Sequence, residues 1–191
     1  MKEKNKLYNI CKIIYTFLLK ILFRPKVYGI ENIPKEGSII FAGNHKHAVD
    51  PVMVMSSTDR IVHYMAKESL FKGIHGKIFE KIGVIKVYRT KSNPVAIMQA
   101  ENILKNGGTI GIFPEGTRNK TEQELLKFRK GTVTIAKRIS ARIVPFAIRG
   151  KYRIFRKGLE IEFGNPIDVS DMEIEEANDY LKNKVLELLR K

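Results

Sequence analysis

From Pro25 onward the sequence alternates between short apolar runs and longer stretches with helical spacing, and this alternation restricts the fold more than any other feature. Six runs have the length and apolar content of buried strands: residues 38–42, 61–66, 84–88, 109–113, 142–148 and 159–163. Helices are expected over residues 51–57, 93–106 and 170–190. Strands that alternate with helices predict an α/β fold in which helices cover the faces of a sheet.

Two of the expected helices have boundary signals. Asn93 is a suitable N-cap, Pro94 fits the first helical position, and Gly107 would end that helix. Ser170 and Glu173 have the spacing of a capping box before the last helix. The chain of 191 residues has no internal repeat and no low-complexity linker. We therefore expect one folded domain, residues 27–191, after a distinct N-terminal segment, residues 1–26.

Residues 1–26 form a basic, apolar segment with the pattern of an amphipathic helix. Its polar positions recur every three or four residues and would lie in one narrow stripe: Asn5, Asn9, Lys12, Thr16 and Lys20. The apolar part is shorter than the ~30 Å hydrocarbon core of a bilayer, and lysines interrupt it. We expect a helix that lies in the membrane interface, with partial burial against the domain as an equal alternative. A signal peptide is a third interpretation, which the internal lysines and the lack of a small-residue cleavage site disfavour.

The formal net charge of +15 indicates a polyanionic partner, either nucleic acid or an anionic membrane surface. Five cations lie within residues 149–157, between aromatic and aliphatic side chains, which is typical of a patch that attracts anionic lipid; a solvated hairpin is the alternative. No recognised nucleic-acid motif accompanies them, so we expect no nucleic-acid partner. The single cysteine, Cys11, fits a reducing cytoplasm, and the four histidines are not paired with cysteines, so we expect no metal site.

The first residues suited to chemistry directly follow the run 38–42. His45 and Asp50 are five residues apart, so a single turn can bring the carboxylate to the imidazole. Such a carboxylate fixes one ring nitrogen and leaves the other to take a proton. No serine or cysteine nucleophile lies in the same segment, which favours direct base catalysis. The alternative is that Asp50 is only the N-cap of the helix that begins at Pro51 and that His45 is an ordinary loop residue.

The second group follows the run 109–113 and has the sequence PEGTR, residues 114–118. Gly116 permits a close approach of the backbone to a ligand, and Arg118 has a planar guanidinium suited to phosphate. Glu115 is expected to orient an arginine or to accept a hydrogen bond from a substrate hydroxyl. A polar turn with a surface ion pair is the alternative.

Together the two groups resemble the glycerophospholipid acyltransferase family, and specifically its 1-acylglycerol-3-phosphate acyltransferases. The motif HxxxxD begins at His45, and FPEGTR follows about 65–70 residues later. Further blocks follow in the family order, namely GVIKVYR at 83–89, FRKG at 128–131 and IVPF at 143–146. The resemblance spans about residues 27–165, which is most of the chain.

The resemblance implies a mixed β-sheet flanked by helices, with His45 as general base and Asp50 as its orienting partner. Arg89 and Arg118 would hold the substrate phosphate. The other substrate-binding positions that it implies are Glu115, Gly116, Thr117 and Lys130.

The implied reaction moves an acyl group from acyl-ACP or acyl-CoA to the sn-2 hydroxyl of lysophosphatidic acid and yields phosphatidic acid for phospholipid synthesis. We expect no cofactor, and we expect a peripheral or monotopic enzyme on the cytoplasmic face of the cell membrane, at an anionic lipid surface. Another lysophospholipid or a lyso-aminolipid is the alternative acceptor. A basic membrane- or nucleic-acid-binding module without enzymatic activity is the alternative class.

Overall fold

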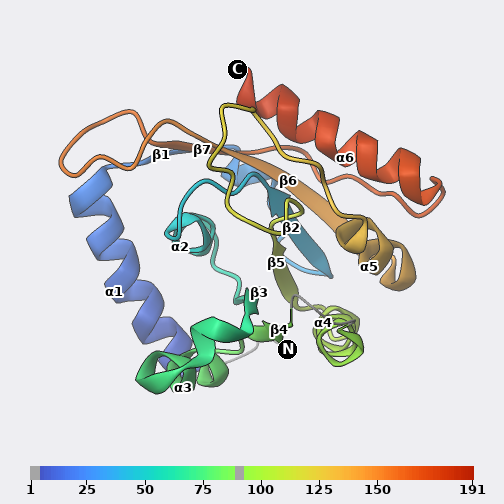
Figure 1. The fold of residues 1–191 in the computed structure, drawn as a ribbon, viewed down its shortest axis with the longest axis horizontal. Coiled ribbons are helices and arrows are strands. Elements are labelled where there is room, and N and C mark those ends of the chain that lie inside the picture. Colours follow the sequence, from blue (N-terminus) through green and yellow to red (C-terminus); the bar gives the residue numbers. More distant parts are fainter. Residues whose placement is uncertain (1–4, 89–92) are drawn as a thin grey trace.

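A computed structural model describes residues 5–88 and 93–191, which form one mixed sheet with helices on both faces (Figure 1). The strand order is β1-β7-β6-β2-β5-β3-β4. Strands β6, β2, β5, β3 and β4 are parallel, whereas β7 is antiparallel to β6, and β1 is parallel to β7. The strands are β1 (Lys26–Tyr28), β2 (Ile39–Gly43), β3 (Val62–Lys67), β4 (Ile85–Val87), β5 (Thr109–Ile112), β6 (Arg142–Arg149) and β7 (Glu160–Phe163). The predicted mixed α/β fold is therefore confirmed.

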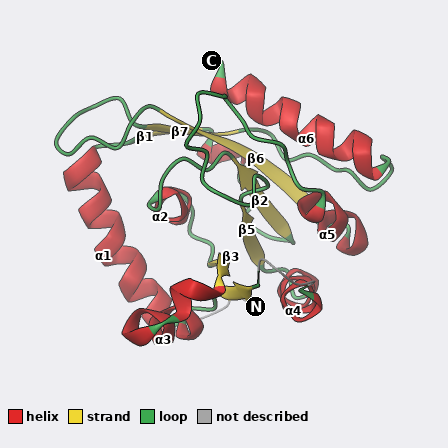
Figure 2. Cartoon of the chain, viewed as in Figure 1, coloured by secondary structure: helices red, strands yellow, loops and turns green. Residues whose placement is uncertain are grey.

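The helices form two layers around this sheet (Figure 2). Alternate residues of β2 serve both layers: Ile40 packs in the cluster with α4, α5 and α6, and Phe41 packs in the cluster with α1 and α2. Because both faces are covered, β2 is buried along its whole length, as the continuous apolar run predicts. The helices are α1 (Lys6–Phe23), α2 (Asp50–Ser56), α3 (Gly73–Lys81), α4 (Pro94–Lys105), α5 (Gly131–Ile139) and α6 (Ile174–Leu189), with 3-10 turns at Ile30–Asn32 and Glu68–Phe71.

The predicted capping box at Ser170 and Glu173 is wrong, and the predicted N-cap Asn93 is correct in position but forms no side-chain cap bond. The Ser170 hydroxyl donates to Asp168 at 2.7 Å, and α6 begins only after Glu173, without a side-chain cap. Asn93 is the N-cap residue of α4 and Pro94 begins the helix, as predicted, but the Asn93 carboxamide exchanges hydrogen bonds with the backbone of Tyr88 at 2.6 and 2.7 Å. Short polar side chains next to a turn compete for local backbone groups, so cap assignments from spacing alone are weak.

Helix α1 is oriented with part of its polar stripe toward the protein. The Lys12 ammonium donates to the Thr58 carbonyl, and burial lowers the pKa of Lys12 despite the nearby Asp59 carboxylate. The buried Tyr8 hydroxyl accepts from the Val62 backbone amide at 3.0 Å. The apolar side chains that point outward are Ile10, Ile13, Ile14, Phe17, Leu18 and Ile21, each more than two-fifths exposed. An amphipathic helix on the surface of a globular protein usually turns its apolar side toward the core and its polar side toward water.

Across residues 5–88 and 93–191, no helix combines the length and the hydropathy that a bilayer crossing requires.

Candidate active site

Three neighbouring parallel strands, β6, β2 and β5, end at the same edge of the sheet, and each leads into a loop that contributes to one site (Figure 1). His45 follows β2, Glu115 follows β5 and Tyr152 follows β6. The carboxyl ends of parallel strands are where ligands usually bind in α/β sheets. Residues 70 and 107 positions away from His45 in the chain are thereby brought beside it.

The entry into the His45 loop depends on two buried residues with no catalytic chemistry of their own. At Gly43, a Cβ atom would lie 2.3 Å from the Phe146 carbonyl oxygen, so only glycine permits the close approach of β2 to β6. The Asn44 carboxamide then binds both backbone groups of Ile148, accepting at 2.7 Å and donating at 2.9 Å. This pairing fixes the direction in which the chain leaves β2.

The His45 and Asp50 side chains are in direct contact. His45 Nδ1 lies 2.8 Å from Asp50 Oδ2, and the Lys46 and His47 backbone amides donate to the same oxygen at 2.7 Å. Because a carboxylate only accepts, His45 donates through Nδ1, and Nε2 is the ring nitrogen that can take a proton. Asp50 lies inside the first turn of α2, where Val49 is the N-cap, so the simple capping role does not hold.

Tyr152 completes the set of donors around Asp50. Its hydroxyl donates to Asp50 Oδ1 at 2.6 Å, and its ring stacks on His47 with centroids 4.4 Å apart. Burial and the adjacent Asp50 charge raise the pKa of Tyr152, so the hydroxyl remains a donor at neutral pH. The fully buried Asp50 carboxylate thus accepts four hydrogen bonds, three through Oδ2 and one through Oδ1. No local sequence pattern indicates this role of Tyr152, because only the pairing of β6 with β2 brings it to the site.

The His45 ring is also held on its face. It stacks on Phe113 with centroids 4.1 Å apart and an interplanar angle of 21°. The side chain remains 17% exposed, so the imidazole is oriented but still reachable from solvent. Phe113 is the first residue of the FPEGTR motif, and its aromatic ring supports one face of the His45 imidazole.

Glu115 binds backbone groups on two loops. One carboxylate oxygen accepts from the His45 amide at 2.7 Å, and the other accepts from the Leu126 amide at 2.8 Å. The side chain is buried, and burial raises the pKa of Glu115, although these two amide bonds and the His45 side chain oppose the shift. The His45 carbonyl in turn accepts from the Asn119 amide at 2.6 Å. Both peptide groups that flank His45 are therefore fixed by the segment after β5.

The rest of the PEGTR motif faces solvent. Gly116, Thr117 and Arg118 are exposed, and Arg118 forms no ion pair with any residue that the structure describes. Gly116 has φ of +67°, a conformation that favours glycine, and a Cβ there would lie 2.6 Å from Nε of Arg129, whose side chain would have to shift. Arg129 also donates its backbone amide to the Pro114 carbonyl at 2.8 Å. Arg129 therefore lies against the motif, although it was not among the predicted site residues.

Two predicted substrate-binding residues lie apart from this group or outside the description. Lys130 forms an ion pair with Glu175 of α6, which directs its ammonium toward that helix. Arg89 belongs to residues 89–92, which lie outside the described residues.

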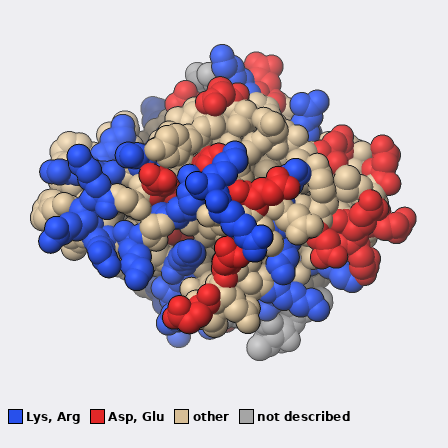
Figure 3. Space-filling model, turned by 90° about the horizontal axis from the view of Figure 1, so that it is seen from above, with Lys and Arg blue, Asp and Glu red and all other residues tan. Residues whose placement is uncertain are grey.

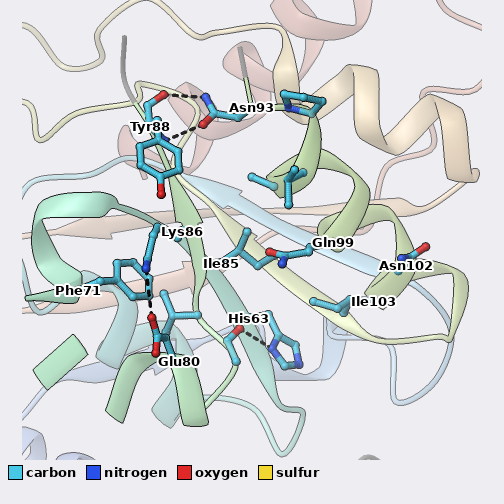
Figure 4. A pocket seen from close by; sticks show the side chains of 15 residues that line it. His63, Phe71, Glu80, Ile85, Lys86, Tyr88, Asn93, Gln99, Asn102 and Ile103 are labelled. Atoms are coloured by element: carbon cyan, nitrogen blue, oxygen red, sulfur yellow. Dashed lines mark hydrogen bonds and ion pairs between the residues drawn. The ribbon is translucent and has the colours of Figure 1, made fainter. Parts of the chain in front are cut away.

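A separate cavity of about 690 Å³ lies along the open edge of β4, between α3 and α4 (Figure 4). Its wall includes the Lys86–Glu80 ion pair, with the Lys86 ammonium 4.8 Å from the centre of the Phe71 ring. None of the seven described residues predicted for the site lines this cavity. The residues that combine hydrogen bonding, charge and burial meet instead at the ends of β6, β2 and β5, which makes that edge of the sheet the candidate site.

Comparison with known proteins defines the class to which this fold and site belong. The profile of the family described as Acyltransferase matches residues 24–149, about two-thirds of the chain. The chain belongs to the acyltransferase family, as the two motifs predicted, and it is an acyltransferase enzyme. This membership argues against the alternative of a basic binding module without enzymatic activity.

The most informative relatives share one name. The chain is 32% identical to the 1-acyl-sn-glycerol-3-phosphate acyltransferase of Bacillus subtilis (strain 168), and the match covers 86% of this chain and 84% of the relative. It is 29% identical to the protein of the same name from Borreliella burgdorferi (strain ATCC 35210 / DSM 4680 / CIP 102532 / B31), over 86% and 68% of the two chains. In structure it resembles the 1-acyl-sn-glycerophosphate (LPA) acyltransferase PlsC from Thermotoga maritima, with a TM-score of 0.75, 25% identity, and coverage of 94% and 75%.

Proposed function

We propose that this enzyme transfers an acyl group from a thioester to the sn-2 hydroxyl of 1-acylglycerol-3-phosphate, with His45 as general base. The observation that carries the proposal is the His45–Asp50 contact of 2.8 Å. The Asp50 carboxylate is fully buried, and it also accepts hydrogen bonds from two backbone amides and the Tyr152 hydroxyl. The names of the relatives from Bacillus subtilis and Thermotoga maritima support the choice of acceptor.

The proposed reaction is a direct transfer. His45 Nε2 takes the proton of the lipid hydroxyl while the hydroxyl oxygen attacks the thioester carbonyl carbon. The tetrahedral intermediate then collapses, the carbon–sulfur bond breaks, and the leaving thiolate takes the proton from the His45 imidazolium. Asp50 holds the tautomer and stabilises the imidazolium while it exists. General base catalysis of this kind contributes ~10²–10⁴-fold to the rate.

The exposed part of the PEGTR motif is proposed to bind the phosphate of the acceptor. Arg118 offers a guanidinium without a described ion-pair partner, and a bidentate contact with phosphate would orient the lipid next to His45. Gly116 and Thr117 contribute a backbone without bulky side chains at this point. We retain Arg89 as the second phosphate ligand on the strength of the family resemblance. Glu115, with both oxygens bound to backbone amides, positions His45 in this proposal.

We further propose that α1 attaches the enzyme to the membrane surface as a peripheral or monotopic anchor, on the cytoplasmic face. Support comes from the exposed apolar side of α1, where Ile13 is 70% and Phe17 63% exposed. Lys and Arg gather at the end of the molecule that carries α1, and Asp and Glu gather at the opposite end over α6 (Figure 3). A surface with this charge and polarity suits an anionic bilayer, where both the acceptor and the product reside.

The experiment that tests the proposal crosses two acyl donors, acyl-ACP and acyl-CoA, with several lysolipid acceptors, and measures thiol release together with the lipid product. Both donors present a phosphopantetheine thioester, so the preference for acyl-ACP or acyl-CoA depends on contacts with the protein surface and not on the chemistry at His45. We expect phosphatidic acid from 1-acylglycerol-3-phosphate to be the fastest product. A faster reaction with an acceptor that lacks the phosphate monoester would overturn the choice of acceptor.

A further inference from the structure

Residues 150–158, which form most of the loop between β6 and β7, present apolar side chains to solvent. Ile154 is 60% and Phe155 is 62% exposed. Four exposed cations surround them: Lys151, Arg153, Arg156 and Lys157. The fifth cation of the predicted patch, Arg149, does not belong to it, because its guanidinium binds Glu162 at 2.8 Å and Glu160 at 3.5 Å on β7. Apolar residues flanked by exposed cations are suited to the headgroup region of an anionic bilayer.

This loop is attached to the C-terminal end of α1. The Phe155 backbone amide donates to the Leu22 carbonyl at 2.6 Å, close to the end of the helix. The rings of Phe23 and Tyr152 meet edge to face, with centroids 5.3 Å apart. In Figure 1 the loop and α1 lie together at the left side of the molecule. The apolar tip of the loop therefore lies at the same end of the molecule as α1, whose exposed side is also apolar.

The same loop reaches inward to the active site. Tyr152, three residues before Phe155, donates to the buried Asp50 carboxylate at 2.6 Å and packs on His47. Phe155 has φ of +59°, which is uncommon for a residue other than glycine or asparagine. A short, defined segment thus joins the exposed surface to the partner of the catalytic base.

We propose that residues 150–158 form a second membrane-contacting element that docks on an anionic phospholipid bilayer and holds Tyr152 against Asp50. In this proposal, which rests on the proposed His45 chemistry, Tyr152 is a positioning residue. Contact of the tip with lipid restrains the loop, and the restrained loop keeps the fourth hydrogen bond to Asp50. The enzyme would then have its best-oriented base when it is seated on the surface that contains its acceptor.

The membrane part is tested by sedimentation of the full chain with vesicles of phosphatidylcholine, with and without phosphatidylglycerol. The double variant Ile154→Ser/Phe155→Asn removes the apolar tip, and asparagine tolerates the positive φ at position 155. The matched control is Val95→Ser/Met98→Ser, which removes two similarly exposed apolar side chains from α4 across the sheet. We expect about tenfold or greater loss of vesicle binding for the tip variant, since each buried apolar side chain adds to interfacial affinity, and no loss for the control. Equal binding of the tip variant and the control would overturn the docking role.

The positioning part is tested with Tyr152→Phe, which keeps the ring and removes the hydroxyl. Without this donor the negative charge of Asp50 is less offset by hydrogen bonds, and the carboxylate stabilises the His45 imidazolium more strongly. The acidic limb of the kcat/KM profile should therefore move to higher pH. Vesicle binding should be unchanged. A pH profile identical to wild type would remove Tyr152 from the mechanism. Because vesicle binding does not depend on catalysis, failure of the docking role is distinguishable from failure of the His45 chemistry, which would appear as an active His45→Ala enzyme.

Discussion

The loop after β2 and the loop after β5 meet at the same sheet edge, but their side chains differ in how far they are buried and hydrogen-bonded within the protein. In the first loop Asp50 is fully buried with four hydrogen bonds, and His45 is held by Asp50 and Phe113. In the second loop Glu115 is similarly buried and bound, whereas Arg118, three residues later, is exposed. The comparison separates motif residues that the fold has already oriented from those whose polar atoms remain for a ligand.

The largest effect is expected at His45, one of the residues that the fold has already oriented. His45→Ala should lower turnover by ~10²–10⁴-fold, because it removes the proton acceptor and leaves the acceptor-binding residues in place. Vesicle sedimentation should give wild-type binding, which separates loss of chemistry from loss of attachment. Thiol release at wild-type rates in this variant would show that the oriented residues are not the catalytic ones.

Glu115→Gln is the next test, because it changes a buried group that is oriented but remote from the lipid in this account. The amide nitrogen of glutamine would face one of the two backbone amides at His45 and Leu126, so one hydrogen bond is replaced by a clash of donors. We expect a loss of stability of about 1–3 kcal/mol and a fall in kcat of about 10–10²-fold, with the acceptor KM close to wild type. Thermal unfolding and steady-state kinetics measure both. A raised acceptor KM with unchanged stability would instead assign Glu115 to direct substrate contact.

Arg118→Ala probes the exposed half of the second loop. It should raise the KM for 1-acylglycerol-3-phosphate about tenfold, because the guanidinium contributes binding and not proton transfer. The KM for the acyl donor should stay the same. Acceptor kinetics equal to wild type would remove Arg118 from the phosphate site.

The smallest effect is expected at Lys130, which the sequence places in the basic stretch after the motif but which pairs with Glu175 on the surface. Lys130→Ala should leave the acceptor KM within about twofold, since its ammonium is paired with Glu175 and an exposed ion pair contributes little. Arg129→Ala is the matched comparison, because Arg129 packs on Gly116, and it should raise the acceptor KM more. The reverse order would restore Lys130 as the ligand-binding residue of this stretch.

The sequence predicted the parts of this structure that depend on local pattern. Continuous apolar runs such as residues 38–42 and 109–113 became buried strands, and the spacing of His45 and Asp50 anticipated their contact. The roles of Phe113 and Tyr152 were not predictable in this way. Each depends on which strands are neighbours, and the order β6-β2-β5 is set by packing of the whole sheet.

The N-terminal helix gives the same lesson for a surface. The polar stripe was visible in the sequence, but its direction was not, because α1 places Lys12 against Thr58 and turns its apolar side outward. Helix α6 has the usual orientation, with Leu181 and Val185 buried against the sheet. Periodicity identifies two faces of a helix, and only the tertiary contacts decide which one is exposed.

The most direct test of the central claim follows the acyl group itself. Thiol release, lipid product and the intact mass of the protein are measured with an acyl thioester in the presence and absence of 1-acylglycerol-3-phosphate. With His45 acting as a base on the lipid hydroxyl, thiol is released one for one with phosphatidic acid, only when the acceptor is present, and the protein mass never changes. An acyl adduct on the protein that forms without acceptor and disappears when acceptor is added would contradict the account.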